Sequence, residues 1–429
     1  MAHAQHVARA MLEVGALRAF VTTYAYRSDG LSAALLKRMP SRIGRPIARQ
    51  LERRAVAELP AQYVHCFPLG EMLRSAAQKA GAGPIVVDRL FDYSSRSFDA
   101  FVAKRYVACA DAVQCFEFTA LESFRRAGEL GVAKILHIPS LDSAHYREIE
   151  RRERGRWTAL SSASDDYFER IFGRRYERRL KEIALADVIV ANSRLTANSH
   201  IAAGADPAKV IVAVLGAPPA IADVEFAPDR GRKPLNVLYA GSFSLGKGAH
   251  YLLQAWQRLD AGAGAVLNVY GRMTLPKAAI AGRGESVVFH GSVPQPVLFR
   301  AYEAADVLVF PTLADGFGSV VAEALAHGLP VITTDQAGAA ELVTPECGFV
   351  VPAGDADALT EALRWCLDNR KQVQAMRFAA LEAARRRQWS DFRRDLIDGL
   401  DAGICRSGYN PCLTREWPAS QRKFETDLS

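Results

Sequence analysis

The hydrophobic and polar positions of the chain form two alternating patterns. Short apolar runs bounded by glycine, proline or polar residues predict buried strands, and apolar residues three or four positions apart predict amphipathic helices. In the first half, the predicted strands cover residues 19–23, 84–87, 112–115, 134–138 and 188–191, and the predicted helices cover residues 5–14, 69–80, 97–109, 119–130 and 167–186. In the second half, the predicted strands cover residues 236–240, 265–270, 286–290, 307–310 and 330–334, and the predicted helices cover residues 248–259, 295–304, 318–326, 357–369 and 371–387. This alternation predicts parallel sheets in α/β domains.

The periodic pattern is interrupted by a proline-rich segment, residues 215–234. We interpret this segment as a linker between an N-terminal domain, residues 1–214, and a C-terminal domain, residues 235–387. A further helix, 388–406, and an irregular tail, 407–429, complete the chain. A doubly wound domain usually begins with a strand, whereas this chain begins inside a predicted helix. The first strand is therefore either absent, or the start codon has been placed late.

Two acidic residues eight positions apart give the segment 310–341 the most specific chemical pattern in the chain. Its sequence, FPTLADGFGSVVAEALAHGLPVITTDQAGAAE, predicts the end of a buried strand, a loop, a helix that begins near Gly318 and a second strand. Asp315 then lies in the loop, and Glu323 projects from the helix about one and a half turns later. An ordinary strand–turn–helix unit is the alternative. The spaced acids, with Gly338 and Glu341 further on, favour a site for a phosphorylated sugar, whose anion would meet the helix N-terminus.

A second pattern typical of an anion-binding site lies in the segment 237–256, VLYAGSFSLGKGAHYLLQAW. It predicts a strand, a loop with three glycines and a helix, with Lys247 at the junction of loop and helix. There the ammonium group adds to the positive end of the helix dipole. Glycine-rich turns of this kind are common, so the signal becomes specific only together with the Asp315 loop. Both turns are expected at the carboxyl ends of parallel strands, which is where open α/β sheets bind ligands.

The order of these motifs resembles a known family. Gly241-(x)5-Lys247-Gly248 is followed by Tyr270-Gly271, His290-Gly291, Tyr302-(x)3-Asp306 and the acid-(x)7-acid pair. This succession resembles the retaining family-4 (group 1) glycosyltransferases of the GT-B fold, strongly over residues 235–367 and weakly in the first half. The resemblance implies two Rossmann-like domains that face each other across a cleft, with helix 388–406 crossing back to the first domain. It also implies a nucleotide-sugar donor on the C-terminal domain, an acceptor on the N-terminal domain, and no metal or other cofactor.

The resemblance also implies roles for single residues. Lys247 would contact the donor diphosphate, Asp315 would bind hydroxyls of the transferred sugar, and Glu323 would accept hydrogen bonds from the ribose. Further donor contacts are implied for Gly241, Ser242, Gly248, Gly271, Arg272, Gly291, Phe317, Gly318 and Ser319, the last three through backbone N–H groups, with 271–272 and 290–293 beside the base. His137 matches in position a family histidine that faces the donor sugar. A structural role for His137 stays open, and His145 is the local alternative.

Two residues depart from the family pattern. Ser242 stands where the family usually has an arginine, so one charge partner of the diphosphate is missing, and Arg272 or an arginine of the first domain would have to replace it. Asp315 stands where the family usually has a glutamate, which is longer by one methylene. Misplacing a reacting group by about 1 Å can lower a rate roughly a hundredfold. The loop must therefore compensate, or the sugar must differ.

The function that these motifs predict is transfer of a hexose-type sugar from a UDP- or GDP-sugar to a glycan or lipid-linked acceptor, with retention of configuration. The resemblance places such a reaction in bacterial surface polysaccharide synthesis. Two alternatives stay open. One is a non-catalytic GT-B subunit that binds a partner transferase, as Ser242, Asp315 and the missing strand suggest. The other is a nucleotide-sugar epimerase or phosphorylase.

Charge adds a prediction about partners. The 429-residue chain has a formal net charge of +7, and the segment Lys37–Arg54 combines seven basic residues with one acid. Either this segment is a solvated face, or it contacts a cytoplasmic membrane surface or an anionic acceptor carrier, since basic clusters are attracted to acidic lipids. Nucleic acid is disfavoured, because the segment lacks interleaved aromatic residues and no known reader motif is present. The mixed charges of 147–181 predict helix with many salt bridges.

The cysteines and the apolar runs predict the compartment. The seven cysteines form no Cys-x-x-Cys pair, so buried free thiols in a reducing cytosol are expected rather than disulfides. No apolar run reaches the roughly 18–20 residues that span a bilayer, and the first residues show no signal-peptide pattern. We therefore expect a cytoplasmic protein, either free or peripheral on the cytoplasmic face of the membrane.

Overall fold

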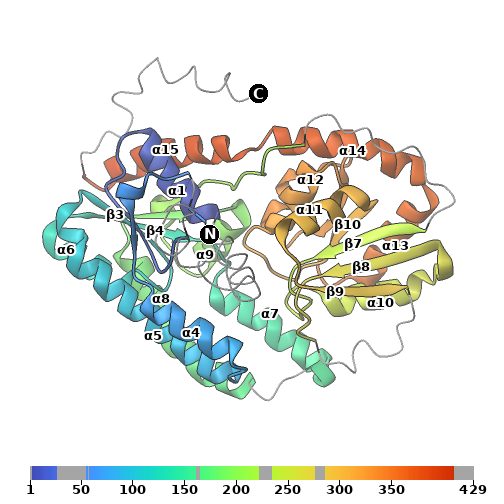
Figure 1. Cartoon of the computed structure of the whole chain (residues 1–429), viewed down its shortest axis with the longest axis horizontal. Coiled ribbons are helices and arrows are strands. Elements are labelled where there is room, and N and C mark those ends of the chain that lie inside the picture. Colours follow the sequence, from blue (N-terminus) through green and yellow to red (C-terminus); the bar gives the residue numbers. More distant parts are fainter. Residues whose placement is uncertain are drawn as a thin grey trace, which may run out of the picture.

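A computed structural model of the chain describes residues 2–26, 55–56, 58–160, 165–221, 234–275 and 286–409. These residues form two α/β units that lie side by side (Figure 1). Each unit is built on parallel strands, which the predicted alternation of strands and helices requires. The predicted linker is described over residues 215–221 and at residue 234, and the basic segment Lys37–Arg54 lies outside the described residues.

The described residues of the N-terminal unit form two parallel sheets. The larger has the strand order β3-β4-β5-β6 and consists of β3 (Ala112–Phe116), β4 (Ala133–Ile138), β5 (Val188–Ala191) and β6 (Val210–Val212). The smaller pairs β1 (Phe20–Thr22) with β2 (Val64–Cys66). The helices of this unit are α1 (Ala2–Glu13), α4 (Leu69–Lys79), α5 (Pro84–Arg105), α6 (Leu121–Leu130), α7 (Ser143–Arg156), α8 (Asp165–Leu185) and α9 (Arg194–Ala202).

The C-terminal unit has one six-stranded parallel sheet, in the order β12-β11-β10-β7-β8-β9. Its strands are β7 (Leu235–Ala240), β8 (Ala265–Tyr270), β9 (Val287–Gly291), β10 (Val307–Phe310), β11 (Val331–Thr334) and β12 (Gly348–Val351). Its helices are α10 (Ala249–Leu259), α11 (Gln295–Ala304), α12 (Ser319–Ala326), α13 (Ala356–Asp368) and α14 (Arg370–Arg385), followed by α15 (Trp389–Arg406). The strand order reverses between β7 and β10, which pair directly. Loops that follow these two strands therefore open at a topological switch point.

One predicted strand is wrong, and several short elements were missed. Residues 84–87 begin helix α5 instead of forming a strand, with Pro84 in the first helical turn, where its missing N–H costs nothing. Residues 97–109 do not form a separate helix, since α5 continues to Arg105 and a short 3-10 helix follows. The missed strands β2, β6 and β12 have only three or four residues, too few to show a period. Helix α7 was missed because its sequence, SAHYREIERRERGR, has almost no apolar stripe.

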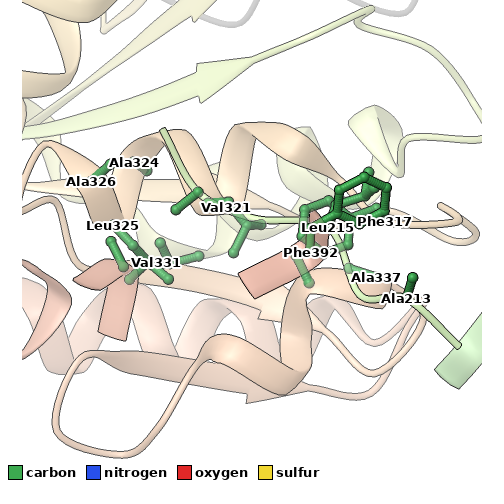
Figure 2. Close-up of a cluster of buried hydrophobic side chains, with 14 of the residues drawn as sticks. Ala213, Leu215, Phe317, Val321, Ala324, Leu325, Ala326, Val331, Ala337 and Phe392 are labelled. Atoms are coloured by element: carbon green, nitrogen blue, oxygen red, sulfur yellow. The ribbon is translucent and has the colours of Figure 1, made fainter. Parts of the chain in front are cut away.

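The two units share part of one hydrophobic core. Its residues come from strands of both sheets and from α1, α12 and α15. Figure 2 shows Leu215, Phe317 and Phe392 next to one another in this cluster. Helix α15 packs against α1, β5 and β6 of the N-terminal unit, and it runs along the same side of the molecule as α14 (Figure 1). The core therefore joins the two units along one side.

The two chain segments that connect the units run next to each other. The amide of Ala217 donates to the carbonyl of Arg387 at 2.8 Å, and the Arg387 side chain donates to the carbonyl of Val214 through Nε at 3.1 Å. A Cβ atom at Gly216 would overlap the backbone of Gln388, so that only glycine fits there. The two connecting segments are therefore closely paired.

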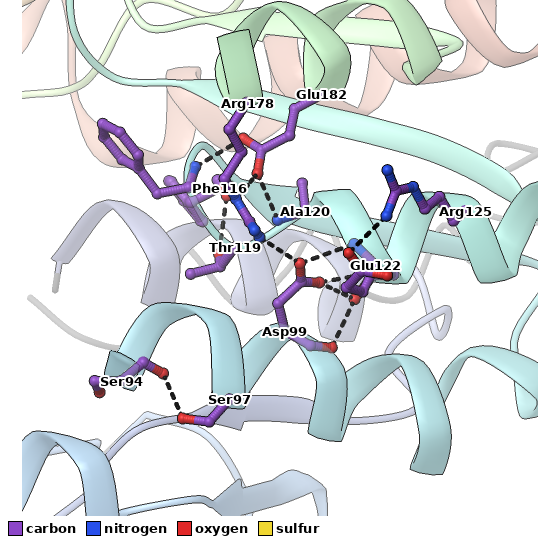
Figure 3. Close-up of polar contacts among 12 residues, drawn as sticks. Ser94, Ser97, Asp99, Phe116, Thr119, Ala120, Glu122, Arg125, Arg178 and Glu182 are labelled. Carbon is purple, nitrogen blue, oxygen red and sulfur yellow. Dashed lines mark hydrogen bonds and ion pairs between the residues drawn. The ribbon is translucent and has the colours of Figure 1, made fainter. Parts of the chain in front are cut away.

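A buried carboxylate ties three helices of the N-terminal unit together (Figure 3). Asp99 of α5 is fully buried and accepts hydrogen bonds from the amides of Glu122 and Ser123 at 2.8 and 3.0 Å, which begin α6. Arg178 of α8 donates to the same carboxylate at 2.7 Å and contacts Glu182 at 3.2 Å. Burial raises the pKa of Glu182, against the lowering effect of hydrogen bonds from the amides of Phe118 and Ala120 and of the Arg178 charge. The arrangement fills the acceptor positions of Asp99, as a buried charge requires.

The predictions for the cysteines and for the charged helices can be compared with the structure. Cys115, Cys347 and Cys366 are buried free thiols, whereas Cys66, Cys109 and Cys405 are exposed, so burial was wrongly expected for these three. The mixed-charge stretch 147–181 falls on two helices, α7 and α8, with ion pairs such as Arg147–Glu169.

Over the part of the chain that the structure describes, no helix has the length and apolar character needed to cross a bilayer.

Candidate functional site

The two glycine-bearing loops meet at the switch point of the C-terminal sheet. The amide of Leu313 donates to the carbonyl of Gly246 at 3.0 Å, which joins the loop after β10 to the loop after β7. Gly248 has a φ of +65° and caps α10, and a Cβ atom at this position would overlap the carbonyl oxygen of Pro311. Gly248 is therefore required both by its left-handed backbone and by the close approach of the two loops.

Lys247 and Asp315 form an ion pair between these loops. The Nζ atom of Lys247 lies 2.6 Å from Oδ2 of Asp315 and 5.9 Å from the centre of the Phe310 ring. Both side chains stay partly exposed, at 27% and 21%, so that both can reach a ligand. The pair lies beside the start of α10 and shortly before α12, two helix N-termini that favour negative charge. An anion bound here would share the ammonium group with the Asp315 carboxylate.

The Asp315 loop is held by its own backbone. The amide of Asp315 donates to the carbonyl of Gln336 at 2.9 Å, and the amide of Phe317 donates to Oδ1 of Asp315 at 3.2 Å. Gly318, with a φ of +84°, caps α12, so the helix begins at Ser319, one residue after the predicted start. Phe317 is buried and its amide is already bonded, whereas Ser319 is exposed. The amide of Val321 donates to the carbonyl of Gly318 at 2.9 Å, so an anion would meet the N–H groups that precede Val321 at the start of α12.

Glu323 lies on α12 and is half-buried. It accepts a hydrogen bond from the hydroxyl of Tyr302 at 3.1 Å. Burial raises the pKa of the Glu323 carboxyl, and the Tyr302 hydrogen bond opposes this effect. Burial likewise raises the pKa of Tyr302. The structure therefore pairs two residues of the sequence signature, although Glu323 makes no direct contact with the Lys247–Asp315 pair.

The remaining predicted positions lie at the neighbouring strand ends. Gly271 has a φ of +142°, and a Cβ atom there would overlap the carbonyl oxygen of Gly241. Gly241, with a φ of +124°, and Gly291, with a φ of +67°, also have left-handed backbones. The side chains of Ser242 and Arg272 are exposed at this edge. The structure thus gathers these positions beside the switch point.

His137 lies elsewhere. Its side chain is 0% exposed, its ring stacks on Phe116, and its Nε2 atom lies 2.9 Å from the side-chain oxygen of Gln114. His3 of α1 covers it, and burial lowers its pKa well below the usual value. These contacts come from the N-terminal unit and give His137 packing partners, while the role that the resemblance implies for it stays a prediction. The alternative, His145, is exposed in the first turn of α7.

Helix α7 supplies residues that the sequence did not reveal. It belongs to the N-terminal unit in the chain, but Tyr146 and Ile149 pack with Leu313 and Ala314 of the Asp315 loop. A Cβ atom at Gly246 would overlap the hydroxyl of Tyr146. A glycine directly before Lys247 was the one sequence signal of this contact. The site is therefore bounded by both units.

A buried carboxylate, Glu153, strengthens the contact between α7 and the C-terminal unit. Glu153 of α7 is 1% exposed and accepts hydrogen bonds from the hydroxyl of Tyr251 at 2.7 Å and from Nε2 of His250 at 3.2 Å. His250 must carry its proton on Nε2 in this arrangement, because the carboxylate can only accept. Burial lowers the pKa of His250, while Glu153 opposes this effect.

We expect the free energy of unfolding to fall as the pH drops below about 6.5, the ordinary pKa of histidine. Burial lowers the pKa of His137, His200 and His250, so the unfolded chain takes up protons that the folded chain does not. The stabilising contribution of each histidine is fully present above the pKa that it has in the unfolded chain. It is lost as the pH falls below that value, by up to about 1.4 kcal/mol per pH unit for each fully shifted group. Urea unfolding at about pH 7.5 and about pH 5 measures the slope. His250→Asn should make it shallower; equal or greater stability at the lower pH would contradict the prediction.

Comparisons with known proteins agree with this geometry. Residues 234–369 match the family model described as "Glycosyl transferases group 1". The chain is 32% identical over 139 residues to the capsular polysaccharide biosynthesis glycosyltransferase CapM of Staphylococcus aureus, covering 30% of this chain and 36% of that protein. It is 31% identical over 237 residues to D-inositol 3-phosphate glycosyltransferase 1 of Catenulispora acidiphila, covering 49% of this chain and 56% of that protein. The chain thus spans less than two thirds of the length of these curated relatives.

Solved structures show the same architecture over most of the chain. Anabaena HepE in complex with UDP and glucose has a TM-score of 0.57 and 16% identity, covering 89% of this chain and 98% of that one. The lipopolysaccharide outer core galactosyltransferase WaaB has a TM-score of 0.53 and 16% identity, covering 74% and 80%. At such identities the likeness shows the fold alone. Residues 234–369 therefore match the group 1 glycosyltransferases, and the two facing α/β units have the GT-B fold.

Proposed function

We propose that this protein transfers a hexose-type sugar from a UDP- or GDP-sugar to a glycan or lipid-linked acceptor, with retention of the anomeric configuration. The observation that carries the proposal is the Lys247–Asp315 ion pair, 2.6 Å long, between two loops at the switch point of the C-terminal sheet. The ammonium group can bind the donor diphosphate, and the carboxylate can accept hydrogen bonds from hydroxyls of the sugar. No other described feature combines both groups beside two helix N-termini.

The chemistry follows from the charges that develop during transfer. Breaking the anomeric C–O bond leaves positive charge on the sugar and negative charge on the departing diphosphate. Lys247 and the N-termini of α10 and α12 stabilise the negative charge, and because they are already in place they need no reorganisation. The acceptor hydroxyl attacks from the leaving-group face, forms the new C–O bond and gives its proton to the departing phosphate oxygen. The proposed reaction needs no divalent metal, and it should continue in the presence of EDTA.

The names of similar proteins support the substrate classes. Anabaena HepE binds UDP and UDP-glucose in its solved complexes, and a Corynebacterium glutamicum relative is described as GDP-mannose-dependent. CapM and the Rhizobium meliloti mannosyltransferase LpsB act in capsular polysaccharide and lipopolysaccharide core synthesis. A cytoplasmic role in bacterial surface polysaccharide synthesis is therefore proposed here too. Contact of Lys37–Arg54 with a membrane is part of this proposal, and co-sedimentation with vesicles of acidic and of neutral lipids tests it.

Nucleotide binding followed by donor turnover tests the proposed function. We expect UDP or GDP to bind in a calorimeter with EDTA present, and the matching nucleotide-sugar to lose its sugar to an acceptor from a lipid-linked glycan extract, detected by mass spectrometry. If neither nucleotide binds, the protein is better described as a non-catalytic GT-B subunit. If the donor is isomerised without acceptor, an epimerase is the correct assignment.

A further inference from the structure

The carbonyl group of Gly316, the residue after Asp315, is held by two hydroxyl groups from the other unit. Its oxygen lies 2.5 Å from Oγ of Ser193 and 3.0 Å from Oγ1 of Thr196. Ser193 caps helix α9, since its side chain accepts from the amide of Thr196. Both side chains are 0% exposed. Each hydroxyl has one proton to donate and the carbonyl has two lone pairs. The Ser193 hydroxyl also lies 3.2 Å from Oγ1 of Thr196, but its shorter distance to Gly316 makes the carbonyl its main acceptor, so both acceptor positions of Gly316 are filled from the N-terminal unit.

The backbone around this contact is closely packed. A Cβ atom at Gly316 would overlap the carbonyl oxygen of Pro139, at the end of β4, and would lie 3.0 Å from Cα of Ser140. A Cβ atom at Gly338 would lie 2.6 Å from Oγ of Ser193. Two glycines of the C-terminal unit thus meet β4 and α9 of the N-terminal unit with no space for a side chain. Because hydrogen bonds are lost with small increases in distance, the contact exists only when the two units are closed on each other.

The same peptide group connects this contact to Asp315. The carbonyl of Gly316 and the N–H of Phe317 belong to one planar peptide unit. That N–H donates to Oδ1 of Asp315 at 3.2 Å, and Oδ2 of Asp315 contacts Lys247. Hydroxyls that orient the carbonyl therefore also orient the N–H that holds the carboxylate. The contacts form a continuous chain from α9 to Lys247, and such chains strengthen one another.

We propose that Ser193 and Thr196 are positioning residues that make the orientation of the Asp315 carboxylate, and through it Lys247, depend on closure of the two units. The consequence for catalysis rests on the proposed function. The coupling itself does not, since it concerns only contacts within this chain. Domain opening releases the Gly316 peptide, and the Asp315 carboxylate loses its backbone donor; closing the units restores both.

Hydrogen exchange of the variant Thr196→Val tests the coupling without any substrate. Valine has nearly the shape of threonine and leaves the Ser193 cap in place, so only the hydroxyl is lost. We expect amide exchange in residues 313–320 to become about three- to tenfold faster, the effect of one lost hydrogen bond, while strands β4 and β8 stay as protected as in the wild type. Thr196→Ser, which keeps the hydroxyl, should restore the protection.

A matched control removes another buried threonine hydroxyl, one that bonds within its own helix. Thr360 of α13 donates to the carbonyl of Ala356 at 2.6 Å, so Thr360→Val should not change exchange in residues 313–320. The proposal is wrong if Thr196→Val leaves that segment unchanged, or if protection is lost equally in β4 and β8, which would show general destabilisation.

Kinetics add a second readout if transfer is detected. Thr196→Val should then lower kcat about tenfold and change the donor KM less than twofold, because Lys247 and Asp315 are still present and only their orientation in the transition state is affected. A rise in donor KM with unchanged kcat would contradict a positioning role. If the wild type proves inactive while the exchange result holds, the proposed function fails and the coupling stands.

Discussion

Replacing Lys247 with alanine is expected to lower kcat/KM for sugar transfer by about a hundred- to a thousandfold, the usual effect of removing one preorganised group that stabilises transition-state charge. Lys247 is placed for this role by the Gly248 turn and by its ion pair with Asp315. Its loss leaves the Asp315 carboxylate uncompensated beside the position of the departing diphosphate. The negative charge then meets a carboxylate instead of an ammonium group.

Initial rates of transfer, together with calorimetry of UDP and GDP, measure this effect. Lys371→Ala removes an exposed lysine at the start of α14 and should change neither rate nor affinity. A Lys247→Ala protein that binds nucleotide and transfers sugar as the wild type does would rule out the proposed role of the ion pair.

Replacing Asp99 with alanine is expected to lower the free energy of unfolding by about 3–5 kcal/mol, as is usual when one partner of a buried ion pair is removed. Arg178 would lose its buried partner, and the first amides of α6 would lose their acceptor. Arg178 would keep Glu182 as its remaining partner. The effect is on folding stability, because Asp99 lies in the N-terminal unit among α5, α6 and α8.

Asp92 on the same helix provides the matched control. It also pairs with an arginine, Arg175 at 2.9 Å, but its side chain is 37% exposed. Asp92→Ala should therefore cost less than about 1 kcal/mol, the usual range for surface ion pairs. Urea unfolding of both variants measures the difference. Similar losses for the two, or a loss below about 1 kcal/mol for Asp99→Ala, would contradict the account of this network.

The sequence was sufficient for the elements whose signal is local. Strands such as β5 and β10 are short runs of residues that are all buried, and such runs are apolar in any parallel sheet that helices cover on both faces. The positions of Lys247 and Asp315 were also predictable, because a loop after a strand of an α/β unit opens at the carboxyl edge. Helix α7 could not be predicted in this way, since its contacts to the other unit use a few residues among many charged ones.

For His137, the position in the sequence does not reveal what surrounds the side chain. It was expected at the end of a strand, and β4 does end one residue after it. Successive side chains of a strand point to opposite faces, and α1 covers the face that His137 occupies. The sequence placed the histidine near the correct edge of the sheet, and only the packing of α1 decided that its ring is covered.

By itself, then, the sequence determined the chemistry of the C-terminal loops: the ammonium group, the carboxylates and the glycines that place them at two helix N-termini. Only the tertiary structure decided how the other unit completes the site. Ser193 and Thr196 contact Gly316 across separations of 123 and 120 residues. Hydroxyls and glycines are common in every sequence, and the role of each depends on the group that lies opposite. That group is known only once the two units are packed together.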